Sequence, residues 1–439
     1  MLSEKGFKKG KFIVILILSI MAMFVGSFQP LKVFAATASA AAAATASASA
    51  SAFLYGDLDG SGDVNSLDYA LIKGYVLGLV ASFPNENGET AADVNGDGSI
   101  DALDISLVKS YILGIIVKFP ADIIITGSFA KGADISWLPQ MEAGGYKFYS
   151  DKGQMQDCLQ ILKDHGIDSV RIRTWVNPST DKWNGHCSTS ETIALAKRAK
   201  GMGFRIMLDF HYSDSWADPG KQTKPAAWMN LSFNDLIKQT YDYTYDVMLQ
   251  LKNNGISPEW VQVGNETNDG MLWEDGRASK NMKNFAWLVN CGYDAVKAVN
   301  SKTKVIVHLS NGFNNSMFRW MFDGLNSNGA RYDVIGISLY PEKDNYANLE
   351  NECLSNMKDM VSRYNKEVMV CEIGMKYDYA SDSKAFISDM INKTRSISDN
   401  KGLGVFYWEP EAYPGMNSYY KGCWNSDGKP TDALDAFLQ

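Results

Sequence analysis

From residue 129 onward, short apolar runs alternate with longer stretches in which apolar residues recur at helical spacing. The short runs predict buried β-strands, and the longer stretches predict amphipathic helices. ETIALAKRAKGMG (191–203), for example, has the helical period and ends in glycine. The pattern predicts eight strands, at 129–135 (FAKGADI), 169–176 (SVRIRTWV), 205–212 (RIMLDFHY), 259–266 (EWVQVGNE), 304–311 (KVIVHLSN), 334–341 (VIGISLYP), 367–374 (EVMVCEIG) and 403–410 (LGVFYWEP).

This alternation predicts the fold of residues 126–439. Eight βα units in a domain of this length are typical of one α/β fold, the (β/α)8 TIM barrel. A doubly wound open sheet is the alternative, but it would need a glycine-rich phosphate-binding turn after the first strand, and the sequence has none there. Seven strand ends carry polar or aromatic side chains, as the catalytic face of a barrel requires: Arg173, His211, Glu266, Asn311, Tyr340, Glu372 and Trp408.

Two glutamates, 106 residues apart, each stand at the end of an apolar run. Glu266 ends EWVQVGNE, and Glu372 lies near the end of EVMVCEIG. An unpaired buried carboxylate is costly, so packing alone does not explain them. At the C-terminal ends of barrel strands they face the loops where catalysis occurs. Two carboxyls at that place can cleave a glycosidic bond, one as proton donor and one as nucleophile.

Other polar residues near these glutamates fit the same chemistry. Arg171 and Arg173 share a face of the second predicted strand, where either would keep the nucleophile charged. One of them could instead form a structural pair with Asp209 or Glu409, and the sequence leaves both readings open. Asn265 is placed to hydrogen-bond the sugar 2-hydroxyl.

The cysteines offer a different nucleophile, which the sequence disfavours. Six cysteines are scattered without CxxC pairing and are expected to be buried small apolar residues. Cys371 adjoins Glu372, but strand alternation should turn one of these side chains to the lumen and the other to the helices. No histidine base stands beside Cys371, so we do not expect it to act as a nucleophile.

An internal repeat precedes the barrel. DLDGSGDVNSLD begins at Asp57 and DVNGDGSIDALD begins at Asp93, and each has oxygen-bearing side chains at positions 1, 3, 5, 9 and 12 with glycine at 6. This is the spacing of a 12-residue calcium loop. The predicted side-chain ligands are Asp57, Asp59, Ser61 and Asp68, then Asp93, Asn95, Asp97 and Asp104; Asp63 and Ser99 would offer carbonyls, and Asn65 and Asp101 would act through water.

These loops differ from an EF-hand. Position 12 is Asp rather than Glu, and no helix is expected before either loop, since the second follows NENGET. Loop-then-helix, twice over residues 55–120, resembles a type I dockerin, the module that plugs cellulosomal enzymes into scaffoldin cohesins. The resemblance implies two bound Ca²⁺ ions and a cohesin partner, although dockerins more often follow their enzyme. A calcium buffer or sensor is the alternative.

The N-terminus predicts export. Residues 1–35 combine a lysine-rich start, the apolar run 12–25 and the small-residue site Val33-Phe34-Ala35, as in a secretory signal peptide. A membrane anchor is the alternative, but the run is short for a span, so none is expected after cleavage. Residues 36–54, mostly Ala, Ser and Thr, predict a flexible linker. Removing five Lys and one Glu with the signal changes the net charge from −8 to −12, which argues against nucleic-acid partners.

The barrel sequence carries further motifs. GADISWLPQMEAGG (132–145), VRIRTWVNP (170–178), DFHYSDSWADPGKQTKPAAW (209–228), VQVGNETNDGMLW (261–273), VIVHLSNG (305–312) and VFYWEPEAY (405–413) together resemble glycoside hydrolase family 53, the endo-β-1,4-galactanases of the clan A barrels. The resemblance implies a secreted, monomeric, retaining endo-galactanase that needs no cofactor for catalysis. It also implies Glu266 as acid/base, Glu372 as nucleophile, and sugar contacts from Arg171, His211, Trp216, Asn265, Tyr340 and Trp408.

Alternatives remain at the sequence level. Trp216 and Trp408 could be packed core residues, His211 a satisfied buried histidine, and His308 a structural or supporting residue. After the sixth strand SLYPEKDNYANLE lacks the expected aromatic-rich turn; after the seventh MKYDYASDSK lacks an acidic insertion with which some bacterial members bind calcium, so no barrel metal is expected. The polymer could be mannan, xylan or glucan instead of galactan, or the barrel could bind sugar without cleaving it.

Overall fold

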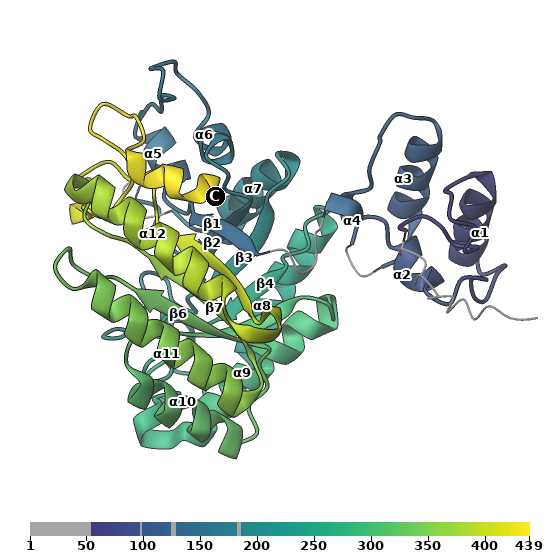
Figure 1. Cartoon of the computed structure of the whole chain (residues 1–439). Coiled ribbons are helices and arrows are strands. Elements are labelled where there is room, and N and C mark those ends of the chain that lie inside the picture. Colours follow the sequence, from purple (N-terminus) through teal and green to yellow (C-terminus); the bar gives the residue numbers. More distant parts are fainter. Residues whose placement is uncertain (1–53, 97–98, 124–128, 182–185) are drawn as a thin grey trace, which may run out of the picture. The chain divides into compact units, whose positions relative to one another are not determined.

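The computed structural model describes residues 54–96, 99–123, 129–181 and 186–439 (Figure 1). The predicted signal peptide, the predicted linker up to residue 53 and the candidate ligand Asp97 lie outside these residues. In the part of the chain that is described, no helix has both the length and the apolar character needed to cross a membrane.

Eight parallel strands close a barrel in chain order, and helices surround it (Figure 1). The first strand pairs with both the second and the eighth, which closes the ring. The predicted TIM barrel is therefore confirmed, and every predicted strand run overlaps one strand. The strands are β1 (Ala130–Asp134), β2 (Ser169–Thr174), β3 (Arg205–Phe210), β4 (Trp260–Val263), β5 (Lys304–Leu309), β6 (Val334–Leu339), β7 (Glu367–Ile373) and β8 (Gly402–Tyr407).

The helix α7 (Thr189–Gly201) shows how the outer layer forms. Ser188 caps it by accepting the Glu191 N–H, and the Glu191 carboxylate accepts the Ser188 N–H in return. Its buried residues, including Leu195 and Ala199, recur at helical spacing and cover the strands. The other barrel helices are α5 (Leu138–Ala143), α6 (Cys158–Asp164), α8 (Phe233–Asn253), α9 (Ala278–Val299), α10 (Asn315–Ser327), α11 (Tyr346–Tyr364) and α12 (Ala380–Arg395).

The barrel lumen is filled by two layers of side chains. An apolar layer occupies the N-terminal half and consists of Ala130, Met207, Trp260, Ile306, Val334, Met369, Cys371, Leu403 and Phe406. Gly132 is needed beside it, because a Cβ atom there would lie 2.1 Å from the Phe406 ring. Above it lies what we call the polar layer, whose buried members are Asp134, Arg171, Asp209, Gln262, His308, Ser338 and Glu372.

A β-bulge changes the expected orientation of Cys371 and Glu372. The pairing of β6 with β7 shifts between Ile337 and Ser338, so that Ser338 lies opposite Glu372 and Cys371 is passed over. Cys371 therefore packs in the apolar layer while Glu372 also reaches the lumen, and the prediction that they face opposite sides is wrong. All six cysteines are free and buried. Burial raises the pKa of the Cys371 thiol to about 12, which excludes a thiolate nucleophile at neutral pH.

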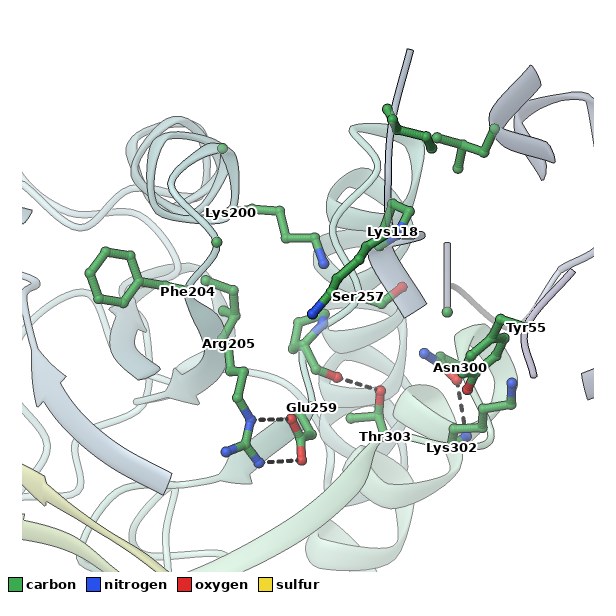
Figure 2. Close-up of a pocket in the computed structure, with 18 residues that line it drawn as sticks. Tyr55, Lys118, Lys200, Phe204, Arg205, Ser257, Glu259, Asn300, Lys302 and Thr303 are labelled. Atoms are coloured by element: carbon green, nitrogen blue, oxygen red, sulfur yellow. Dashed lines mark hydrogen bonds and ion pairs between the residues drawn. The ribbon is translucent and has the colours of Figure 1, made fainter. Parts of the chain in front are cut away.

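Charged residues form ion pairs at the N-terminal ends of the strands, on the face of the barrel opposite the polar layer. Figure 2 shows Arg205, the first residue of β3, in a two-point ion pair with Glu259, just before β4. Both nitrogen–oxygen distances are 2.7 Å, and the guanidinium lies 4.4 Å from the Trp260 ring centroid. Nearby, the Thr303 hydroxyl donates to the Pro258 carbonyl. This face of a TIM barrel generally serves stability rather than catalysis.

The N-terminal module is helical and internally repeated. Its helices are α1 (Ser66–Val76), α2 (Gly88–Ala92), α3 (Ala102–Ile112) and α4 (Pro120–Ile123). Tyr75 stacks on Phe83 with ring centroids 4.6 Å apart, and 36 residues later Tyr111 stacks on Phe119 at 4.5 Å. α2 contradicts the expectation that no helix precedes the second loop. The segment Glu-Thr-Ala-Ala completes one short helix there because both of its alanines are buried in the module core.

Candidate active site

A cleft of about 380 Å³ opens at the C-terminal ends of the strands, within the size range of small-molecule sites. Its walls come from the ends of, and the loops after, β1, β3, β4, β6, β7 and β8. The barrel residues predicted to act in catalysis or sugar binding all line the cleft except Arg171, which lies below it in the polar layer. The lining residues are Trp137, His211, Trp216, Ala217, Asp218, Asn265, Glu266, Tyr340, Glu372, Trp408, Asn417, Ser418 and Tyr419.

Glu372 is held by an ion pair and a hydrogen bond at the floor of the cleft. Arg171 Nη2 lies 2.8 Å from its Oε1, and the Tyr340 hydroxyl donates to its Oε2 at 2.7 Å. Burial raises the pKa of the Glu372 carboxyl, whereas Arg171 and Tyr340 oppose this rise by stabilising the ionised form. This carboxylate is thus fixed in position, with its charge supported from both sides.

The Glu266 carboxyl is also desolvated but has fewer stabilising partners. Burial, and next the negative charge of Glu372, raise the pKa of Glu266 above the ordinary glutamate value. Its backbone is left-handed, with φ of +43°, a conformation that is strained for a glutamate and common at functional sites. Glu372 has an ion pair with Arg171 and a hydrogen bond from Tyr340, whereas no ion pair of Glu266 is found among the described contacts. A proton shared by the two carboxyls is therefore held preferentially by Glu266.

Arg171 is the hub of the polar layer. Fully buried, it contacts three carboxylates, since besides Glu372 its nitrogens lie 2.5 Å from Asp134 and 2.9 Å from Asp209. Arg173, by contrast, forms its ion pair with Glu409. Both alternatives left open by the sequence therefore hold, because Arg171 supports Glu372 and Asp209 together while Arg173 forms a structural pair.

The side chains of Asn265 and His211 are also fixed. Asn265 Oδ1 accepts from Arg171 at 2.8 Å, and its Nδ2 donates one hydrogen to the Ala217 carbonyl, which leaves the second for a ligand. His211 Nδ1 accepts the Ala217 N–H at 3.0 Å, and its Nε2 lies 3.0 Å from Asp209. Both His211 nitrogens are therefore occupied by the protein, although the residue lines the cleft.

Aromatic rings form one wall of the cleft. Trp216 and Trp408 lie 6.0 Å apart, and Trp137 contacts both edge-on, at 5.8 and 4.9 Å. Tyr419 packs against Trp408 at 4.8 Å. Sequence reasoning missed Trp137 as a lining residue, although it stands two residues after the first predicted strand, inside the GADISWLP motif.

Three polar lining residues were also missed. Asp218 lies in the DFHYSDSWADP motif, so the sequence did carry a signal for it. Asn417 and Ser418 belong to the loop after β8 and have left-handed backbones, with φ of 48° and 63°. Nothing in their local pattern marks them, since their place at the cleft depends on how that loop folds back.

The first loop of the N-terminal module gathers carboxylates. Oxygen atoms of Asp57, Asp59 and Asp68 lie within 4.8 Å of one another. The Asp57 carboxylate also accepts N–H groups from the glycine turn, at Gly60 and Gly62. Acidic oxygens converging around such a turn suit a hard cation such as Ca²⁺.

The second loop repeats this framework. Asp104 accepts the N–H groups of Asn95 and Asp101, as Asp68 accepts those of Asp59 and Asn65. Asn65 and Asp101 each cap the following helix by accepting an N–H. The remaining predicted ligands of the described residues, Ser61, Asp63, Asp93 and Ser99, lie in the same two loops.

Comparison with known proteins agrees with both parts of the chain. The family model described as Glycosyl hydrolase family 53 matches residues 130–437, and that described as Dockerin type I domain matches residues 55–113. The arabinogalactan endo-β-1,4-galactanase of Humicola insolens is 35% identical over 303 residues, which cover 64% of this chain and 89% of that protein.

Solved structures show the same likeness. The Ignisphaera aggregans GH53 catalytic domain matches with a TM-score of 0.65 and 30% identity, covering 72% of this chain and 96% of that one. A fungal β-1,4-galactanase matches with a TM-score of 0.66 and 30% identity, over 71% of this chain and 100% of that one. The chain therefore belongs to glycosyl hydrolase family 53 and carries a type I dockerin domain ahead of its glycoside hydrolase barrel.

Proposed function

We propose that this protein is a retaining endo-β-1,4-galactanase that cuts galactan, including the type I arabinogalactan side chains of pectin. The observation that carries the reaction is the pair of desolvated cleft carboxyls, of which Glu372 is paired with Arg171 and Tyr340 while the pKa of Glu266 is raised by burial and by Glu372. The names of the family 53 relatives support galactan as the substrate.

In the first step Glu372 attacks the anomeric carbon and the glycosidic bond breaks. Glu266 gives its proton to the departing oxygen, so a glycosyl ester of Glu372 forms and the shortened chain leaves as an alcohol. Arg171 and Tyr340 hold the attacking oxygens in place, which reduces the cost of reaching the transition state. The second Nδ2 hydrogen of Asn265 can bond the sugar 2-hydroxyl, a contact that strengthens in the transition state.

In the second step Glu266, now ionised, removes a proton from water. The water oxygen bonds to the anomeric carbon, the ester breaks and Glu372 returns to its carboxylate. Two displacements at one carbon retain its configuration. Trp216 and Trp408 would stack on sugar rings beside this centre, since aromatic faces pack against their C–H surfaces.

The N-terminal module would attach the enzyme to a scaffold. Type I dockerin domains bind calcium, and we assign one Ca²⁺ ion to each loop, with Asp57 and Asp68 in the first and Asp93 and Asp104 in the second. The predicted partner is a scaffoldin cohesin. With the signal peptide predicted at 1–35, we infer that the protein acts outside the cell as part of a cellulosome.

Two competing functions are tested together with this one. A family member of altered specificity would cut mannan, xylan or glucan instead, and a non-catalytic barrel would bind sugar only. The experiment is product analysis on linear β-1,4-galactan, mannan, xylan and glucan with the wild type, Glu266→Gln and Glu372→Gln. Glu352→Gln, at an exposed position on α11, is the matched control.

We expect short galacto-oligosaccharides from the wild type and the control, and very little from either cleft variant. Cleavage of another polymer with galactan left intact would overturn the substrate assignment. A wild type as inactive as Glu372→Gln on all four polymers would favour the sugar-binding barrel.

A further inference from the structure

The loop after β3 carries a glutamine that faces the backbone of the cleft residues Asn265 and Glu266. Gln222 is 2% exposed, and it follows a tight turn in which Asp218 and Lys221 exchange backbone hydrogen bonds. Its side-chain nitrogen Nε2 lies 2.8 Å from the Asn265 carbonyl oxygen, 3.1 Å from that of Asp218 and 3.5 Å from that of Glu266. The Gln222 side chain therefore joins the loop after β3 to the segment just after β4.

The carbonyl groups determine the orientation of this amide. A carbonyl oxygen only accepts, so the atom of Gln222 that faces all three must be the donor Nε2, because the reverse orientation would place Oε1 against them. Its two hydrogens serve the two shorter contacts, with Asn265 and Asp218. Oε1 is turned away from these carbonyls, and it is buried with no hydrogen-bond partner among the described residues. A buried acceptor without a partner is costly, which indicates that the two donated hydrogen bonds have a use.

The backbone that Gln222 holds is strained. The Asn265 carbonyl belongs to the peptide group that leads into Glu266, whose φ is +43°. A glutamate with a left-handed backbone is disfavoured and persists only where surrounding contacts hold it. On the other side of the same peptide group, the Glu266 N–H donates to His308 Nδ1 at 3.4 Å, and one residue later the Glu266 carbonyl accepts the Asn268 N–H at 2.8 Å. The short bond from Gln222 therefore fixes the oxygen of a peptide group whose geometry sets the direction of the Glu266 side chain.

We propose that Gln222 is a positioning residue for the acid/base Glu266, holding the strained Asn265–Glu266 peptide group so that the Glu266 carboxyl lies at the glycosidic oxygen. This inference rests on the proposed function, which gives Glu266 its role. The Asn265 side chain and the Glu372 carboxylate have anchors of their own, described above. Loss of the Gln222 amide should therefore impair proton transfer by Glu266 and leave the attack by Glu372 largely intact.

The test compares two substrates that differ in their need for an acid. The leaving oxygen of a galacto-oligosaccharide must be protonated, whereas a dinitrophenyl group on galactobiose departs as a stable phenolate without a proton. The measured quantity is kcat/KM, because it covers the steps up to the departure of this group and excludes the later hydrolysis of the ester. Gln222→Met keeps the approximate size of the side chain and removes the donor. We expect it to lower kcat/KM about 10–100-fold on the oligosaccharide and less than about 3-fold on the dinitrophenyl substrate.

Three further variants define the result. Glu266→Gln should show the same contrast between the substrates more strongly. Gln222→Glu should resemble Gln222→Met, because a carboxylate there would face the carbonyl oxygens that now accept. Asn356→Leu is the matched control, since Asn356 is a buried amide that donates to the Gly312 carbonyl after β5 and does not line the cleft. This control should keep the wild-type ratio of the two kcat/KM values. Equal losses on both substrates in Gln222→Met, or no loss on either, would overturn the proposal.

Hydrogen exchange separates this proposal from the proposed function, because it needs no substrate. Mass spectrometry of the peptide 261–273 from the free protein should show exchange of the Asn268 amide about 10-fold faster in Gln222→Met and unchanged in Asn356→Leu. Unchanged exchange in Gln222→Met would overturn the positioning contact itself. A wild type that cuts no galacto-oligosaccharide would instead overturn the proposed function, and faster exchange in Gln222→Met would then still support the hold of Gln222 on the Glu266 backbone.

Discussion

Tyr340→Phe gives the sharpest test of the charge state of Glu372. The change removes one oxygen, whose hydroxyl donates to Glu372 Oε2 at 2.7 Å, and leaves the ring in place. Burial raises the pKa of Tyr340 well above its usual value, so in the wild type this hydroxyl stays protonated and always donates. Arg171 remains bound to the other carboxylate oxygen in the variant.

The size of the effect follows from these contacts. A hydrogen bond to a charged group is worth about 1.5–3 kcal/mol, and one pKa unit corresponds to about 1.4 kcal/mol. Because Arg171 still stabilises the ionised form, we expect the lower end of that range, a rise of about 1 unit in the pKa of Glu372. The proposed nucleophile must be ionised to attack, so raising the pKa of Glu372 moves the acid limb of kcat/KM to higher pH.

The assay is kcat/KM on a galacto-oligosaccharide of defined length, measured from acid to neutral pH. Activity should fall most at low pH and recover partly as Glu372 ionises. Tyr243→Phe is the matched control, since this tyrosine hydroxyl donates to the Trp175 carbonyl and has no contact with Glu372. An acid limb that stays in place in Tyr340→Phe would show that Glu372 is not the group whose ionisation it reports.

Two further predictions concern stability and metal binding. Burial raises the pKa of Asp209, but Arg171 and the neighbouring histidines His211 and His308 together outweigh it and lower this pKa to about 2. The stabilising contribution of the ionised Asp209 is therefore lost only as pH falls through that value. Arg171→Met should therefore lower the free energy of unfolding by about 3–5 kcal/mol at neutral pH, and by less in acid, where the carboxylates that have lost Arg171 become protonated. Urea titrations followed by tryptophan fluorescence measure this free energy, and an equal loss at every pH would contradict the prediction. The exposed pair Arg331–Asp294 supplies the control, for which Arg331→Met should cost at most about 1 kcal/mol. Removing calcium with a chelator should abolish cohesin binding, measured by calorimetry, because Asp57, Asp59 and Asp68 repel one another without a cation. The double variant Asp57→Ala with Asp93→Ala should have the same effect. Binding that persists in excess chelator would refute the calcium assignment.

The apolar periodicity was sufficient to predict the barrel, because buried parallel strands and amphipathic helices differ in period. The same periodicity predicted that Glu266, Glu372 and Arg171 lie toward one end of the barrel, since the C-terminal ends of parallel strands share an edge. It could not show the bulge at Ser338, which breaks the alternation on which the placement of Cys371 relied. Nor could it show the hydrogen bonds of Gln262 with Arg171 and Asp209, because a glutamine inside an apolar run has no local feature that identifies its partners.

The six cysteines also make the barrel a reporter of its own motions. All six are free and buried, and they are spread around the barrel. They lie on α6 (Cys158), before α7 (Cys187), on α9 (Cys291), on α11 (Cys353), in β7 (Cys371) and after β8 (Cys423). A thiol reagent can reach each one only when its surroundings open. The labelling rate of each cysteine therefore measures the free energy of local opening at that position, and six such rates would map how firmly successive parts of the barrel are closed, without introducing a single mutation.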